Sequence, residues 1–254
     1  MIKNKNNYNI IYGYHPIKEA ILSNNIKILI VIIDNNKINK YNYLINIIKK
    51  KNISIKYTNK YYIENIIYKN NFKKKKNYQG LISYILYKKY NLNKILNNKK
   101  RLIILILYNI TDIKNIGSII RSSVCFKISL IIIQKNYYIL NPEIIKISSG
   151  SIFRIPICRV NNIEKTIIFL KKKNIKILSI IEKSKKSCIN YFNNIKKKTS
   201  IALILGNEEK GISKNIIKIS NEIIKIPIDK KISSLNVSVA CGIILYEIYK
   251  NYII

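Results

Sequence analysis

The sequence predicts an α/β fold with a mostly parallel sheet, and two observations support this prediction. Short runs rich in isoleucine and leucine alternate with segments of helical periodicity over residues 101–254. The chain also has 254 residues, enough for one large domain or two small ones with a substantial core. Strands that alternate with helices favour parallel pairing, so ligands are expected beyond the carboxyl ends of the strands.

The pattern divides the chain into two parts. In residues 101–254 it predicts strands at 101–108, 128–133, 155–160, 175–181, 201–205 and 223–228, and helices at 115–126, 163–172, 212–219 and 237–249. In residues 1–87 it predicts strands at 26–33, 53–57 and 81–86, and a helix at 43–50. Residues 88–100 are polar without a clear period, so we interpret them as a linker.

The chain is strongly basic. It has 47 Lys and Arg against 12 Asp and Glu, a formal net charge of +35. Such a balance favours a polyanionic partner, above all nucleic acid. Enrichment in Ile, Asn, Lys and Tyr is also typical of an AT-biased genome. Codon bias and RNA binding therefore explain the positive charge equally well. The run Lys73–Lys76 is typical of a solvated loop; the alternative is that it contacts phosphate.

Several classes of protein do not fit the sequence. The longest apolar runs, at 102–107 and 128–133, are much shorter than the ~20 residues of a membrane-spanning helix. The polar first residues do not resemble a signal peptide. The four cysteines form no CxxC pair, and His15 alone does not supply a metal cluster. We therefore expect a soluble cytoplasmic protein with free thiols and no metal.

Three segments carry the candidate functional residues. In ITDIKNIGSIIRSSVCF (110–126), Asn115 lies at a predicted helix start, Gly117 allows close backbone approach, and Arg121 follows six residues after Asn115. Taken alone, this segment also fits a capped helix whose arginine reaches solvent.

In ALILGNEEKGIS (202–213), a buried strand ends at Gly206, and Glu208 and Gly211 follow before the next helix. A strand–glycine loop–helix holds nucleotide-like ligands through backbone N–H groups, although this one matches neither GxGxxG nor the Walker A pattern. The third segment, residues 226–248, places Ser233, Ser234, Leu235 and Asn236 before a helix whose start is rich in small residues. Ser and Asn cap helices, and small residues allow a backbone to lie close to a neighbour.

In this order and spacing, the three segments resemble the motifs of the SpoU-type (TrmH-like) RNA ribose 2′-O-methyltransferases of the SPOUT superfamily. IIYGYHPIKEAI (10–21) and NYQGLIS (77–83) resemble the start and end of a small N-terminal RNA-binding domain. The two-part layout is similar to that of the enzymes that methylate a guanosine of 23S ribosomal RNA, and less similar to the shorter tRNA enzymes.

The resemblance implies a trefoil-knotted, mostly parallel sheet with helices on both faces, preceded by a small α/β RNA substrate-binding domain at 1–87. It implies a homodimer in which Arg121 faces RNA and cofactor across the interface. S-adenosylmethionine would be held around Gly206, Ile226 and Leu235. The implied catalytic group is Asn115, Arg121, Glu208, Ser234 and Asn236.

The chemistry of ribose methylation assigns roles to these side chains. A ribose 2′-hydroxyl needs its proton removed or its developing oxyanion stabilised. Arg121 stays protonated in proteins, so we expect it to hold phosphate and stabilise the alkoxide while the proton leaves to water or phosphate. The two asparagines would orient these groups by hydrogen bonds, and Glu208 would position either Arg121 or the helix entrance.

The sequence departs from the family pattern at three positions. Lys127 stands where the family usually has glycine, Phe153 where an acidic residue is common, and Tyr78 where histidine is often found. Tyr12, Tyr14 and His15 either stack on RNA bases or pack the small domain. Two alternatives to a ribosomal RNA methyltransferase are a tRNA ribose methyltransferase and an inactive RNA-binding assembly factor.

Overall fold

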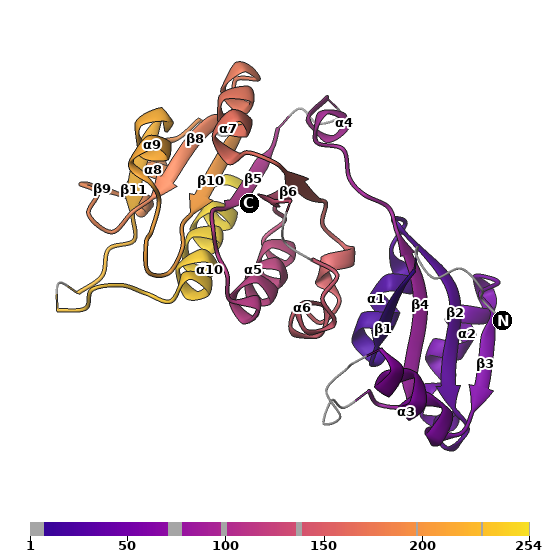
Figure 1. Cartoon of the computed structure of the whole chain (residues 1–254). Coiled ribbons are helices and arrows are strands. Elements are labelled where there is room, and N and C mark those ends of the chain that lie inside the picture. Colours follow the sequence, from indigo (N-terminus) through magenta and orange to yellow (C-terminus); the bar gives the residue numbers. More distant parts are fainter. Residues whose placement is uncertain are drawn as a thin grey trace. The chain divides into compact units, whose positions relative to one another are not determined.

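The computed structural model describes residues 8–70, 78–97, 101–135, 139–196, 198–229 and 231–253, so the basic run Lys73–Lys76 lies outside the described residues. The chain forms two compact units (Figure 1). Unit 1 comprises Met1–Lys88 and Leu140–Arg154, and unit 2 comprises Lys89–Ile139 and Ile155–Ile254. Residues 140–154 thus group with the N-terminal part, whereas the sequence pattern assigns them to the C-terminal domain.

Unit 1 contains a mixed four-stranded sheet in the order β1-β4-β2-β3. β4 pairs antiparallel with β1 and β2, and β3 pairs parallel with β2. The elements are β1 (Asn9–Tyr12), α1 (Tyr14–Leu22), β2 (Ile26–Asp34), η1 (Asn35–Lys37), η2 (Asn39–Tyr41), α2 (Asn42–Lys50), β3 (Ile55–Thr58), α3 (Lys60–Lys69), β4 (Leu81–Tyr87), α6 (Pro142–Ile147) and η3 (Ser151–Phe153). The predicted strands and helix of this part are confirmed to within two residues at each end, while the periodicity did not predict β1, α1, α3 or α6.

The aromatic residues near the start of unit 1 have separate environments. Tyr12 is buried and packs in a cluster that includes Ile63 and Ile67 of α3. The ring of Tyr14 stacks on Tyr41 with centroids 5.9 Å apart, and His15 is exposed. Tyr12 therefore serves packing.

Residues 140–154 pack against the N-terminal elements of unit 1. The Ser23 hydroxyl donates to the carbonyl of Phe153 at 2.8 Å, and Arg154 forms an ion pair with Glu19 of α1. Phe153 is fully buried in this contact region. Burial accounts for an aromatic side chain at a position where the family often has an acidic one.

Unit 2 is built on a seven-stranded sheet in the order β7-β6-β5-β10-β8-β11-β9, with every pair parallel. Its elements are α4 (Leu92–Asn97), β5 (Ile103–Leu107), α5 (Ile113–Cys125), β6 (Leu130–Gln134), β7 (Ile157–Val160), α7 (Ile163–Lys172), β8 (Lys176–Ile180), β9 (Lys186–Ser187), α8 (Cys188–Asn194), β10 (Ile201–Leu205), α9 (Lys214–Ile219), β11 (Glu222–Lys225), α10 (Val237–Ile248) and a π-helical turn, η4 (Tyr249–Ile253).

Both faces of this sheet are covered. Alternate strand residues such as Ile104, Ile132 and Ile204 form one core cluster with Ile167 of α7 and Ile216 of α9. On the other face α5 and α10 lie side by side (Figure 1). The predicted parallel α/β fold is therefore confirmed, and the knot implied by the resemblance stays a prediction.

Several features of unit 2 differ from the sequence pattern, which did not predict β9 or α8. The predicted linker contains a short helix, α4, whose Leu96 is buried. The strand predicted at 223–228 ends at Lys225, because Pro227 lacks the N–H that a strand ladder needs. Lys127 has a φ of +55° directly after α5, a conformation that favours glycine and explains the family's usual residue there.

Candidate active site

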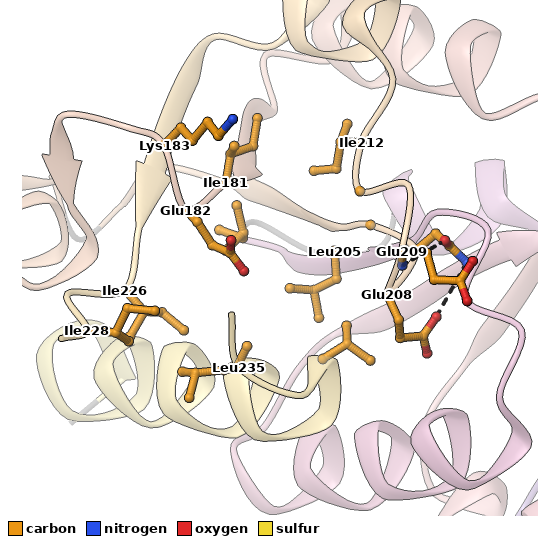
Figure 2. Close-up of a pocket in the computed structure, with 16 residues that line it drawn as sticks. Ile181, Glu182, Lys183, Leu205, Glu208, Glu209, Ile212, Ile226, Ile228 and Leu235 are labelled. Carbon is orange, nitrogen blue, oxygen red and sulfur yellow. Dashed lines mark hydrogen bonds between the residues drawn. The ribbon is translucent and has the colours of Figure 1, made fainter. Parts of the chain in front are cut away.

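A cavity of about 270 Å³ lies beyond the carboxyl ends of β8 and β10, where a parallel sheet is expected to bind its ligand. It is lined by Ile180–Lys183, Leu205–Glu209, Gly211, Ile212, Ile226, Ile228, Leu235, Val237 and Ala240. Figure 2 shows the labelled apolar side chains around the hollow, with Ile226 and Leu235 on one side of it. All three predicted cofactor-binding residues, Gly206, Ile226 and Leu235, line this cavity.

The loop after β10 approaches its own end closely at Gly206. A Cβ atom built there would lie 2.5 Å from the backbone carbon of Gly211 and 2.7 Å from its carbonyl oxygen. No side chain fits at that distance. Gly211 has a φ of +62°, which lets the chain turn back toward Gly206 before α9 begins.

Asn207 holds this loop in shape, a role that the sequence reasoning missed. Its side-chain oxygen accepts hydrogen bonds from the backbone N–H groups of Glu209 (3.0 Å) and Lys210 (2.9 Å). Its amide donates to the carbonyl of Asn109 at 2.9 Å, which ties the loop to the segment that precedes α5. An Asn directly after a strand-ending Gly is a signal for such a side-chain-to-backbone turn.

A chain of hydrogen bonds joins residues from all three motifs. The Asn115 amide donates to Glu208 Oε1 at 2.8 Å, and the Asn115 oxygen accepts from the Asn236 amide at 3.1 Å. The Asn236 oxygen in turn accepts from the backbone N–H and the hydroxyl of Ser238 (2.9 and 2.6 Å), and so caps α10. Because a carboxylate only accepts, the chain fixes which way both amide groups point.

Local sequence explains how these three side chains meet. Asp112 caps α5 by accepting from the N–H of Lys114 at 2.8 Å, so Asn115 lies in the first turn of the helix, where it is buried. The loop after β10 supplies Glu208, and the residue before α10 supplies Asn236. Glu208 therefore contacts the entrance of α5, the second of the two positions expected for it.

Arg121 and Ser234 lie outside this chain of contacts. Arg121 is exposed on α5, six residues and ~9 Å along the helix axis from Asn115. Within the described ranges it makes no hydrogen bond or ion pair. Ser234 is also exposed. The structure brings together three of the five predicted catalytic residues and leaves the other two open to solvent.

The charge around the cavity contrasts with the charge of the chain. The lining includes Glu182, Glu208 and Glu209 but only one lysine, Lys183, which gives three negative charges and one positive, a net of −2. The whole chain carries +35. A cavity of this charge favours a ligand with a positive centre.

Comparisons with known proteins identify a matching family model and several relatives. The sequence model of the SpoU rRNA Methylase family matches residues 102–246. The 23S rRNA (guanosine-2′-O-)-methyltransferase RlmB of Blochmanniella floridana is 32% identical over 242 residues, which cover 94% of this chain and 93% of that protein. An uncharacterized tRNA/rRNA methyltransferase of Borreliella burgdorferi is 40% identical over 159 residues, covering 62% of this chain and 68% of that protein.

Among solved structures, the SpoU methyltransferase AviRb of Streptomyces viridochromogenes, in complex with AdoMet, shares the fold. Its TM-score is 0.77 at 19% identity, and the match covers 99% of this chain and 95% of that chain. In the part of the chain that is described, no helix is long and apolar enough to cross a membrane.

Proposed function

The chain belongs to the SpoU rRNA methylase family, and from this premise we propose that it methylates a guanosine ribose of 23S ribosomal RNA. That it is an S-adenosylmethionine-dependent RNA 2′-O-methyltransferase follows from the family. The observation that carries the choice of RNA is the similarity to the Blochmanniella floridana enzyme. It extends over 94% of this chain and so includes the N-terminal part.

The cavity beyond β8 and β10 fits S-adenosylmethionine. The cofactor has a sulfonium and an ammonium group, and the net charge of −2 in the cavity lining complements them. Glycine at position 206 lets the loop after β10 close on Gly211, which gives the loop the shape that lines the cavity. Ile226 and Leu235 offer apolar surface. When bound, the cofactor supplies an electrophilic methyl group.

Asn115, Glu208 and Asn236 act as a positioning group in this proposal. Their hydrogen bonds tie the loop after β10, the start of α5 and the start of α10 into one fixed arrangement. Two of these segments also line the cavity, so the same contacts that orient the amides fix the cofactor loops. Preorganisation of this kind places reacting groups in line at little further cost in entropy.

Arg121 is proposed to bind the RNA phosphate and to stabilise the developing alkoxide. Its guanidinium is exposed and makes no contact with a described residue that would compete. The planar fork of an arginine matches a phosphate with two parallel hydrogen bonds. The proton of the 2′-hydroxyl leaves to water or phosphate, and Ser234 lies exposed before α10 as a further contact to substrate.

We further propose that the enzyme is a homodimer that pairs through α10. Val239, Ile243 and Tyr246 are 50%, 38% and 52% exposed and share one face of this helix. A helix that is apolar on all sides is normally buried on all sides. Tyr246→Glu should convert the dimer to monomer in analytical ultracentrifugation. Tyr61→Glu, at an exposed tyrosine of unit 1, is the matched control. Wild-type protein that sediments as a monomer would end this proposal.

Transfer of labelled methyl groups tests the proposed substrate. Purified protein is incubated with labelled S-adenosylmethionine and either unmodified 23S ribosomal RNA or tRNA, and the labelled nucleotide is then identified. We expect label on the ribose of a guanosine in 23S RNA. Label only in tRNA would replace the substrate and keep the chemistry. Absence of transfer from folded protein that binds RNA would favour the assembly-factor alternative.

Arg121→Lys separates the role of the guanidinium fork from that of charge alone. We expect transfer to fall by roughly 100-fold, because one oxyanion-stabilising group is worth about that much. Affinity for S-adenosylmethionine should stay unchanged. Lys114→Ala removes an exposed positive charge from the same helix and serves as the control. Near-normal turnover by Arg121→Lys would exclude the proposed role.

A further inference from the structure

A second cavity of unit 2, about 510 Å³ in volume, shares no lining residue with the cofactor cavity. It lies beside the edge strand β9 and along one face of α8. Its lining consists of Lys176, Lys185, Lys186, Ser187, Asn190, Tyr191, Asn194 and Ile195. Apart from Ile195, every lining residue carries a polar or charged side chain.

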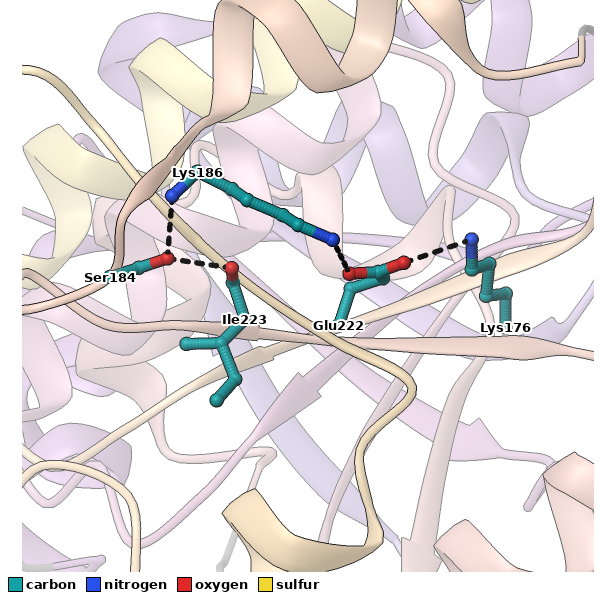
Figure 3. Close-up of polar contacts among 5 residues, drawn as sticks. All are labelled: Lys176, Ser184, Lys186, Glu222 and Ile223. Carbon is teal, nitrogen blue, oxygen red and sulfur yellow. Dashed lines mark hydrogen bonds and ion pairs between the residues drawn. The ribbon is translucent and has the colours of Figure 1, made fainter.

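The charges at this cavity do not balance. Lys176 and Lys186 both pair with a single carboxylate, Glu222, at 3.5 and 2.6 Å (Figure 3). The hydrogen bond from Lys186 is the main cause that holds the pKa of Glu222 below its ordinary value, so this carboxylate is ionised at neutral pH. Lys185 is exposed and forms no ion pair with a carboxylate among the described residues. Three ammonium groups against one carboxylate leave a net charge of +2.

The loop that carries two of these lysines is held in place. The Ser184 hydroxyl donates to the carbonyl of Ile223 at 2.7 Å and accepts from the backbone N–H of Lys186 at 3.1 Å (Figure 3). The loop is therefore tied to β11, the neighbouring strand. The ammonium groups of Lys185 and Lys186 thus project from a fixed backbone, and a ligand that they bind loses less of its binding energy to ordering.

Tyr191 adds a buried O–H donor without an acceptor. By geometric criteria its hydroxyl has no hydrogen-bond partner within the described part of the chain. The ammonium of Lys176 lies 5.3 Å from the centre of the ring and is close enough to the hydroxyl to oppose the rise of its pKa. An ammonium only donates, so this contact leaves the proton of the hydroxyl without an acceptor. Burial raises the pKa of Tyr191, so the hydroxyl keeps its proton at neutral pH and can donate it. A buried donor without an acceptor costs free energy unless water or a ligand satisfies it.

We propose that this second cavity binds a phosphate group, held by Lys185 and Lys186 and by the hydroxyl of Tyr191. Excess positive charge and an unsatisfied O–H donor are what a phosphate oxygen requires. The phosphate belongs either to the RNA backbone or to a free phosphate or nucleotide, since the recognising chemistry is shared. The site lies outside the cofactor cavity and does not depend on methyl transfer.

Titration with inorganic phosphate and pyrophosphate, followed by NMR of the backbone amides of residues 185–195, tests the site directly. We expect saturable shifts confined to β9 and α8. Tyr191→Phe keeps every charge and removes only the donor, so affinity should fall by about fivefold, the value of one hydrogen bond. Lys185→Gln should also weaken binding, while Glu222→Gln should strengthen it because it frees two lysines.

Lys172→Gln, at an exposed lysine of α7, controls for loss of general charge. Shifts that are absent, or that Lys172→Gln reduces as much as Lys185→Gln, would overturn the proposal. An unchanged affinity in Tyr191→Phe would also contradict it. RNA should displace pyrophosphate if the RNA backbone is the source of the phosphate. In that case the slope of log K for RNA binding against log salt concentration should be smaller by about one in Lys185→Gln. RNA binding without that change would identify a free phosphate or nucleotide.

Discussion

Replacing Gly206 by alanine isolates the steric requirement of the cofactor loop. The φ of Gly206 is not in the left-handed region, so alanine adopts the backbone conformation without strain. The added Cβ would lie 2.5 Å from the backbone carbon of Gly211, and this contact must open by about 1 Å to reach a normal ~3.5 Å. The obstructing atoms are backbone, so no side-chain rotation relieves the overlap.

We expect two consequences for Gly206→Ala. The free energy of unfolding falls by about 1–3 kcal/mol, the usual cost of overpacking. The affinity for S-adenosylmethionine, measured by isothermal titration calorimetry, falls by at least about tenfold because the displaced loop lines the cavity. Gly242→Ala is the control, since a Cβ there meets no atom within 4 Å. An affinity within about twofold of wild type for Gly206→Ala would refute the reasoning.

Three further predictions follow from particular contacts. Asn115→Asp places a second carboxylate beside Glu208. Methyl transfer should therefore drop at about pH 8 and partly recover near pH 6, as the pair of carboxylates takes up a proton. Asn115→Ala, the control, should show no recovery. Glu222→Gln should lower the free energy of unfolding by about 0.5 kcal/mol at neutral pH. Because the folded pKa of Glu222 is depressed, this difference disappears in urea unfolding as pH falls below that pKa. Iodoacetamide should label exposed Cys125 first, since burial raises the pKa of Cys158 to about 11 and that of Cys241 further. Fast labelling of Cys241, read by mass spectrometry, would contradict the packing of α10.

The sequence pattern was most accurate for the helices and strands whose bounds are marked by apolar residues alone. The bounds predicted for β10 and α7 agree with the structure, because each is an apolar segment with polar residues at both ends. The three residues predicted to bind the cofactor line one cavity, since Gly206, Ile226 and Leu235 follow strands or precede a helix whose ends meet at one edge of the sheet. That this cavity binds the cofactor stays a prediction.

What the sequence did not predict depends on contacts between distant residues. The position of Asn207 after Gly206 indicates a local turn, but its hydrogen bond to the carbonyl of Asn109, 98 residues earlier, is visible only in the folded structure. The choice between the two positions expected for Glu208, beside Arg121 or at the start of α5, likewise depends on how distant segments meet. The grouping of residues 140–154 with the N-terminal unit rests on contacts such as that between Ser23 and Phe153, 130 positions apart.

That grouping means that the gene cannot be cut once to yield two self-sufficient pieces. The polypeptide crosses between the units at residues 88/89, 139/140 and 154/155. The N-terminal unit therefore includes residues 140–154, which interrupt the sequence of the C-terminal unit. A fragment beginning near residue 89 would keep Ile144, Ile145, Ile152 and Phe153 while losing α1 and β1, the partners of α6 and η3. Recombination that swapped the first 88 residues would have to preserve this apolar match. The two units are therefore expected to be inherited together, and not to be exchanged between proteins as independent modules.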